Sequence, residues 1–126
     1  MYQAYALLLP ESPFTLEQAA ARLNRGFATF TLKQSEEQLS LIREDWEIHL
    51  VLEEGAQVLE ESEGIAEGIG GDQEEMGIRR CNRRVAVWSD IPDPEMAHFS
   101  DFQSVVDMLK SFPGVIVVDP RQPSLL

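Results

Sequence analysis

Apolar positions follow a helical spacing in some parts of the chain and a strand-like spacing in others. Residues 2–9 form a short apolar run that Pro10 ends, which predicts a buried strand. From Thr15 to Gly26 apolar residues recur at intervals of three, four and seven positions, which predicts an amphipathic helix. Thr15 followed three positions later by Gln18 has the spacing of a capping box, so we expect the helix to begin there.

The middle of the chain has the composition of strands. Short segments rich in β-branched, aromatic and aliphatic residues predict three consecutive strands, at residues 28–34, 38–45 and 46–53. Glu44 and Asp45 lie at the expected turn between the last two, which predicts a hairpin. In the third strand Trp46 begins an apolar series at period two, so His49 falls on the opposite face.

The second half predicts two further helices and two further strands. An apolar helical face begins after residue 55, and its glycines predict that the helix frays by residues 68–71. Asp72 is a candidate start for a short helix. Ser100 is the predicted N-cap of the last helix, which Pro113 closes. The remaining predicted segments are strands at residues 83–89 and 115–120 and a loose tail at residues 121–126.

The predicted order of elements is β-α-β-β-β-α-β-α-β. Helices recur between strands and hairpins are expected near residues 34–38 and 44–46, so the pattern indicates an α+β fold. We expect a two-layer α/β sandwich with a mixed sheet. The opening β-α-β-β suggests a ferredoxin-like half. The halves show no repeat and no long linker divides them, so residues 1–126 are expected to form a single domain.

The composition is that of a globular protein. Hydrophobic residues make up 44% of the 126 positions and charged residues 25%, which is ordinary for a chain that buries its own core. The N-terminal apolar run lacks a basic flank and ends well short of membrane-spanning length, so we expect neither a signal peptide nor a membrane helix. Cys81 is the only cysteine, which excludes an internal disulfide and favours a cytoplasmic location.

The formal net charge of −12 comes from one part of the chain, residues 36–75, which we call the acidic segment. This segment holds fourteen acidic residues against Arg43 alone, whereas residues 76–126 hold six residues of each sign. Nucleic acid is therefore an unfavourable partner, because binding it requires Lys and Arg to neutralise phosphates. The one basic patch follows directly and is expected to compensate the acidic field locally; it comprises Arg79, Arg80, Arg83 and Arg84.

Residues 89–102 (SDIPDPEMAHFSDF), the proline loop, are the candidate for metal chemistry. Carboxylates with one imidazole suit divalent ions, which makes Asp90, Asp93, Glu95 and His98 a candidate ligand set. Their spacing matches no known motif, and the EF-hand pattern is absent. The favoured interpretation is structural: the two prolines stiffen a connection that leads into the helix at Ser100.

Other candidates for chemistry are weaker. His49 and His98 are the only histidines, and neither lies in a recognisable nucleophile motif. His49 is predicted to be a half-buried structural residue of its strand. Cys81, between arginines, is a reactive thiol only if it is exposed. The glycines near residue 68 match no phosphate-binding motif, and no cofactor is expected.

Three functions follow from these patterns. The leading hypothesis is a non-catalytic interaction module whose acidic segment contacts a basic protein partner, for example a toxin bound in the manner of an immunity protein. Its predicted contact residues are Glu53, Glu54, Glu60, Glu61, Glu63 and Glu67. The second hypothesis is a metal-dependent or hydrolytic enzyme that uses the proline loop. The third is an accessory domain that associates with itself.

Overall fold

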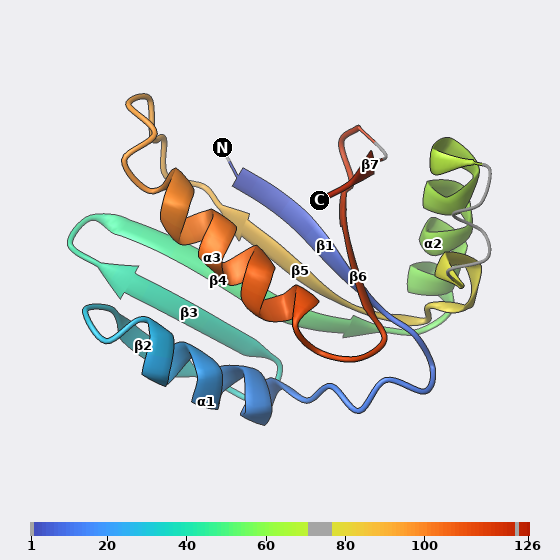
Figure 1. The fold of residues 1–126 in the computed structure, drawn as a ribbon, viewed down its shortest axis with the longest axis horizontal. Coiled ribbons are helices and arrows are strands. Elements are labelled where there is room, and N and C mark those ends of the chain that lie inside the picture. Colours follow the sequence, from blue (N-terminus) through green and yellow to red (C-terminus); the bar gives the residue numbers. More distant parts are fainter. Residues whose placement is uncertain (1, 71–76, 123) are drawn as a thin grey trace.

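A computed structural model describes residues 2–70, 77–122 and 124–126 (Figure 1). The strands are β1 (Tyr2–Leu8), β2 (Thr31–Gln34), β3 (Gln38–Arg43), β4 (Trp46–Glu54), β5 (Arg83–Ser89), β6 (Val115–Asp119) and β7 (Ser124–Leu125). The helices are α1 (Leu16–Gly26), α2 (Ala56–Ile69) and α3 (Phe99–Lys110), with a short 3₁₀ turn, η2 (Ile78–Arg80). The fold thus combines α and β elements, as the sequence predicts.

The seven strands form one sheet in the order β2-β3-β4-β5-β1-β6-β7. Every pairing between the described strands is antiparallel, so the prediction of a mixed sheet was wrong. The reason is the position of β1. Strands β5 and β6, which α3 connects, run in the same direction, but β1 lies between them and pairs antiparallel with both.

The ferredoxin-like start is not confirmed. The chain does begin β1-α1-β2-β3, yet β2 lies at the far edge of the sheet, with β3, β4 and β5 between it and β1. The structure also differs from the prediction at the C-terminal end of the described chain. Residues 124–125, in the tail that was expected to be loose, form β7 and pair with β6.

The main core lies on the sheet face that α1 and α3 cover. Figure 1 shows these two helices in front of the sheet, and they contact each other. In β1, Ala4, Ala6 and Leu8 point to this face. Buried residues of the other strands complete it: Leu39, Leu41, Trp46, Ile48, Leu50, Val85, Val87 and Val117. The period-two pattern predicted for β4 is confirmed.

Helix α2 packs on the opposite face of the sheet, and Figure 1 shows it at one end of the sheet. Leu7, Ile116 and Val118 point to that face and contact Ile65 and Ala66 of the helix. The molecule is therefore not a simple two-layer sandwich, because helices cover both faces where α2 lies. Over β2, β3 and the first part of β4 this second face carries polar side chains, as antiparallel sheets allow.

Local signals set the helix ends. Thr15 caps α1 as predicted, because its hydroxyl oxygen accepts a hydrogen bond of 3.2 Å from the Gln18 amide. Helix α2 ends at Ile69, and Gly70 follows with a φ of +69°, a conformation that glycine adopts at little cost. Helix α3 begins at Phe99, one residue before the predicted cap at Ser100. None of the helices in the described part of the chain is long and apolar enough to cross a membrane.

Candidate functional site: the Arg84 cluster and the pocket beside α2

A buried arginine links the acidic segment to the centre of the sheet. The Arg84 side chain is only 6% exposed, and its Nε donates a 2.8 Å hydrogen bond to Glu53. Its Nη2 lies 3.1 Å from a carboxylate oxygen of Glu61, and its guanidinium lies over the Tyr5 ring, 4.0 Å from the centroid. The remaining nitrogen, Nη1, is buried with no hydrogen-bond partner among the described residues. We call these four residues the Arg84 cluster.

Four elements bring the Arg84 cluster together. Glu53 of β4 lies directly opposite Arg84 of β5, Tyr5 comes from β1, and Glu61 reaches the sheet from α2. Burial alone lowers the pKa of Arg84, but the hydrogen bond to Glu53 and the two carboxylate charges outweigh it and raise that pKa. One guanidinium faces two carboxylates, so the cluster keeps a net negative charge.

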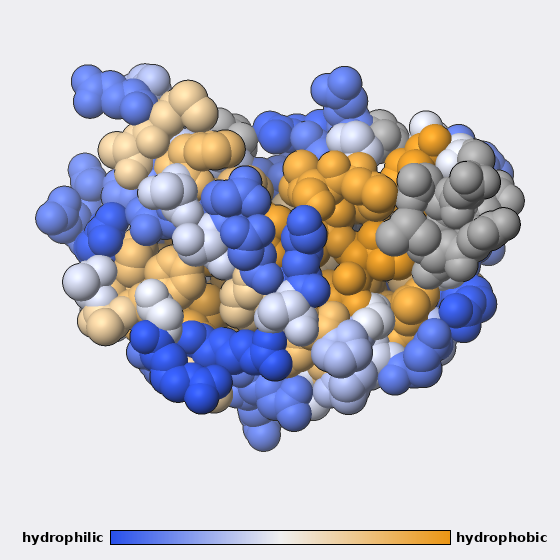
Figure 2. Space-filling view, viewed as in Figure 1, coloured by the Kyte–Doolittle hydropathy of each residue, from blue (hydrophilic) through white to orange (hydrophobic). Residues whose placement is uncertain are grey.

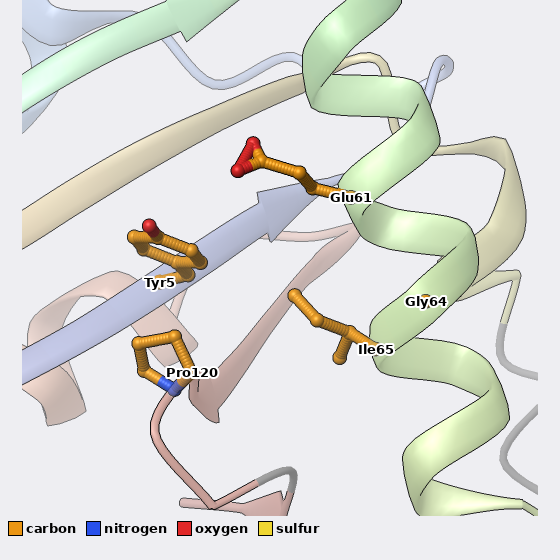
Figure 3. Close-up of a pocket in the computed structure, with 5 residues that line it drawn as sticks. All are labelled: Tyr5, Glu61, Gly64, Ile65 and Pro120. Carbon is orange, nitrogen blue, oxygen red and sulfur yellow. The ribbon is translucent and has the colours of Figure 1, made fainter.

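A pocket of about 320 Å³ opens next to this cluster, between α2 and the sheet (Figure 3). In Figure 3, Glu61 and Ile65 point from the helix towards Tyr5, and Pro120 lies beneath the ring. Gly64 completes the lining. The pocket therefore combines an aromatic ring, two apolar side chains and one carboxylate. This combination suits a side chain with an aliphatic stem and a cationic head.

The six predicted contact residues divide into two groups. Glu53 and Glu61 hold Arg84 and are each about 40% exposed, while Glu67 lies 3.7 Å from Arg79. The other three are exposed to solvent: Glu54, Glu60 and Glu63. The structure thus places half of the predicted set against the basic patch and leaves the rest outward around the end of β4 and along α2.

A second acidic hollow lies at the end of β4. It measures about 580 Å³ and is lined by Glu37, Val51, Leu52, Glu53 and Glu54. The turn between β2 and β3 contributes Glu37, whose carbonyl accepts a hydrogen bond from the Leu52 amide. Carboxylates from distant parts of the acidic segment therefore meet on one surface, which extends from this hollow to α2.

In the proline loop, Asp93 organises the backbone. One of its oxygens accepts a 2.8 Å hydrogen bond from the His98 amide and a 2.5 Å bond from the Tyr2 hydroxyl. The other accepts from the Ala97 amide at 3.0 Å. The hydrogen bond from Tyr2 has the largest effect on Asp93 and lowers its pKa. The hydrogen bonds from the two backbone amides lower this pKa further. Asp93 thus ties the loop to β1 just before α3 begins.

His98 is held in an aromatic environment. Its ring stacks on the buried Trp46, with centroids 4.4 Å apart and planes 6° apart. Its Nδ1 lies 3.1 Å from Asp101, which in turn binds Arg43 at the same distance. Tyr2 adds a stacked contact with Phe102 and an edge contact with Trp46; together Tyr2, Phe30, Trp46, His98, Phe99 and Phe102 form what we call the aromatic cluster.

The structure does not gather the predicted metal ligands. Asp93 and His98 turn to the partners described above, whereas Asp90 and Glu95 are exposed. Within residues 2–70, 77–122 and 124–126, no group of three or more His, Cys, Asp or Glu side chains is arranged to hold a metal ion. The geometry accounts for the loop as the connection that positions α3.

The hydrogen bond between Tyr2 and Asp93 predicts a change in stability at alkaline pH. Burial, assisted by Asp93, raises the pKa of Tyr2 from 10.0 to about 12. The unfolded chain therefore loses this proton near pH 10, while the folded chain keeps it to about pH 12. We expect the stabilisation from Tyr2 to be complete below pH 10 and to disappear as the pH rises to about 12.

Urea denaturation of wild type and Tyr2→Phe between pH 8 and about 12 tests this expectation, because only the wild type has the titrating phenol. The difference in unfolding free energy between the two proteins should shrink across that range. A difference that stays constant with pH would contradict the assigned hydrogen bond.

Cys81 is fully buried between β1, β6 and η2, and its thiol contacts the Gly77 carbonyl. Burial raises its pKa to about 11, despite the neighbouring arginine charges. A buried, protonated thiol is a poor nucleophile. Cys81 is thus a core residue, buried more deeply than the half-buried position near a helix end that the sequence favoured.

An apolar patch covers the region of β6 and β7. Figure 2 shows it as the largest hydrophobic area on the side that carries α1 and α3. A hollow of about 280 Å³ in this region is lined by Lys110, Val115, Ile116, Val117, Leu125 and Leu126. The last two residues are about 40% exposed. Since β7 is an edge strand, this is where a second chain would meet the sheet if the protein associates with itself.

Sequence patterns did not identify Tyr5 or Arg84 as site residues. Both were assigned to strands, and only the antiparallel pairing of β5 with β1 and β4 brings them beside α2. An available signal was Arg84 next to the apolar run at residues 85–88 of the same strand, because a buried charge without a partner is too costly to persist. No family model matches this chain, and the searches of curated proteins and of solved structures found no significant match.

Proposed function

We propose that this protein is an interaction module that binds a basic protein partner through the acidic surface formed by the end of β4 and helix α2. The observation that carries the proposal is the pocket beside α2, where Glu61 and the Tyr5 ring stand between apolar walls. The aliphatic part of a lysine or arginine from the partner packs on Ile65 and Pro120. Its charge meets Glu61 and the ring.

The charge distribution supports a cationic occupant. The Arg84 cluster pairs one positive charge with two negative charges, so a second cation is attracted to its carboxylates. Exposed carboxylates at Glu54, at the end of β4, and at Glu60 and Glu63, on α2, add negative charge to this part of the molecule and steer a basic surface towards it. Inhibition of a basic toxin, as an immunity protein achieves, is one form of this function. The cytoplasmic location expected from the sequence stays a prediction.

The two alternative functions have less support in the geometry. The proline loop uses its best ligand, Asp93, to hold the backbone and Tyr2, so the metal-dependent function would require that network to open. Self-association through the edge of the sheet has the exposed leucines of the tail in its favour. However, β7 pairs through only two residues and offers few main-chain groups to a second chain.

The experiment measures the affinity for the purified partner, once identified by affinity capture, at low and at high salt. We expect the dissociation constant to rise at least about tenfold between about 0.1 M and about 1 M salt, because the screening length falls to roughly a third. Glu60→Gln/Glu63→Gln should weaken binding at low salt, and Glu61→Gln should weaken it further. Indifference of the affinity to salt would refute the proposal.

A matched control separates this surface from the overall charge. Glu44→Gln/Asp45→Asn also removes two negative charges from the acidic segment, but these lie in the turn at the other end of β4. The control should bind within about twofold of wild type, because the removed charges lie far beyond a Debye length of the pocket. Equal weakening by both double variants would show that only the net charge matters.

A further inference from the structure

A serine, a histidine and a glutamate lie next to one another on the polar face of the sheet, away from α2. Ser40 of β3 lies directly opposite His49 of β4 in the hairpin. Its neighbours Leu39 and Leu41 point into the main core, so Ser40 points to the other face. Glu47 precedes His49 by two residues on the same strand and therefore shares that face.

The distances connect these three side chains in order. Ser40 Oγ lies 2.8 Å from His49 Nδ1, and His49 Nε2 lies 3.4 Å from Glu47 Oε2. Gln38 Nε2 donates a 3.2 Å hydrogen bond to Ser40 Oγ. To accept the Ser40 proton at Nδ1, the neutral imidazole must carry its hydrogen on Nε2, the nitrogen next to Glu47. Trp88 packs against the His49 ring, with centroids 5.3 Å apart, and restrains its orientation.

The serine borders an open hollow of about 210 Å³. Lys33, Gln34, Ser35, Gln38 and Ser40 line it. Lys33 pairs with Ser40 across β2 and β3, so a cation and the Gln38 amide line the hollow together with Ser40. Such donors stabilise the negative charge that develops on a carbonyl oxygen during acyl transfer. The hollow is small and polar, which limits a substrate to a short acyl group.

We propose that Ser40 is a nucleophile that hydrolyses short-chain carboxylic esters, with His49 as its general base and Glu47 as the residue that positions His49. The order nucleophile, base and carboxylate is the arrangement that activates a serine in enzymes of unrelated folds. This activity would be additional to partner binding. The residues involved are separate from the pocket beside α2, so either proposal can fail without the other.

The reaction balances with water as the only other reactant. Ser40 Oγ attacks the carbonyl carbon while its proton passes to His49 Nδ1. The bond to the alkoxy oxygen breaks, and that oxygen leaves as the alcohol with the proton from His49. Water then gives a proton to His49 and attacks the acyl-serine. The carboxylic acid leaves, and Ser40 takes the proton back.

The test treats the folded, full-length chain with a fluorophosphonate and locates the adduct by peptide mass spectrometry. We expect the adduct on Ser40, with no Ser40 adduct on urea-unfolded protein, because only the fold places His49 beside it. His49→Gln should lower the labelling rate at least about 100-fold, the contribution typical of a general base. Glu47→Gln should lower the rate less, and Glu47→Asp should recover part of the loss.

Ser35 provides the matched control. It lines the same hollow, but its hydroxyl interacts with the Gln38 carbonyl instead of a histidine. Ser35→Ala should retain labelling, whereas Ser40→Ala should lose it together with p-nitrophenyl acetate hydrolysis; melting curves confirm that both variants fold. Ser40 left unlabelled in the folded wild type, or Ser40→Ala hydrolysing the ester at the wild-type rate, would overturn the proposal.

Discussion

Replacing Trp46 with alanine is expected to lower the free energy of unfolding by about 3–5 kcal/mol, the range for large-to-small changes in a core. Trp46 is 1% exposed and lies at the centre of the aromatic cluster. Its ring stacks on His98 and makes edge contacts with Tyr2 and Phe30, with centroids 6.3 and 6.4 Å away. The variant would leave a cavity and remove the ring on which His98 stacks.

Trp46→Phe is the control for this prediction. Phenylalanine keeps most of the apolar surface and also removes Nε1, which is buried without a hydrogen-bond partner among the described residues. We therefore expect the loss to be less than half that of alanine. The unfolding free energy of both variants is measured by urea denaturation monitored by circular dichroism. Tryptophan fluorescence is not comparable, because each variant lacks one of the two tryptophans. A loss below about 1 kcal/mol in Trp46→Ala would mean that the ring is not part of a close-packed core.

Arg84→Met should cost about 2–3 kcal/mol of folding free energy. Removing one partner of a fully buried ion pair costs more, about 3–5 kcal/mol, because the remaining charge is left without compensation. The loss is smaller here because Glu53 and Glu61 are each about 40% exposed and regain some hydration. Methionine keeps the apolar contact with Tyr5, so the measured change reports chiefly on charge.

The triple variant Arg84→Met/Glu53→Gln/Glu61→Gln tests that interpretation. It removes the two carboxylates that Arg84→Met leaves facing each other, and we expect it to recover a substantial part of the lost stability. As a reference, Arg80→Ala breaks an ion pair in which both side chains are more than half exposed, and it should change the stability little. No recovery in the triple variant would show that Arg84 acts through packing alone.

The elements whose evidence is local were predictable. The N-cap at Thr15, the period-two pattern of β4 and the turn at Glu44 and Asp45 each depend on neighbouring residues, and each is present in the structure. The turn also sets the hairpin register, since Arg43 pairs with Trp46 and Ser40 then pairs with His49. The sequence therefore contained enough information to predict that Ser40 faces His49, although it led us to interpret His49 as a structural residue.

The prediction for the start of α3 missed a contribution from outside the helix. Ser100 had the composition of an N-cap, but the helix begins at Phe99. Asp93 binds the amides of Ala97 and His98 and thereby shapes the chain ahead of the helix. Its position depends on Tyr2, a residue 91 positions away, so a local pattern could not reveal it.

The sequence by itself determined the three long helices and the first six strands, how the β3–β4 hairpin is aligned and where the negative charge is concentrated, but not β7. The tertiary structure alone decided that β1 lies between β5 and β6, and with it the meeting of Tyr5, Glu61 and Arg84 at one pocket. The physical reason is that periodicity, caps and turns act over a few residues. The order of strands depends instead on which distant apolar faces bury each other best, and this is a property of the whole chain.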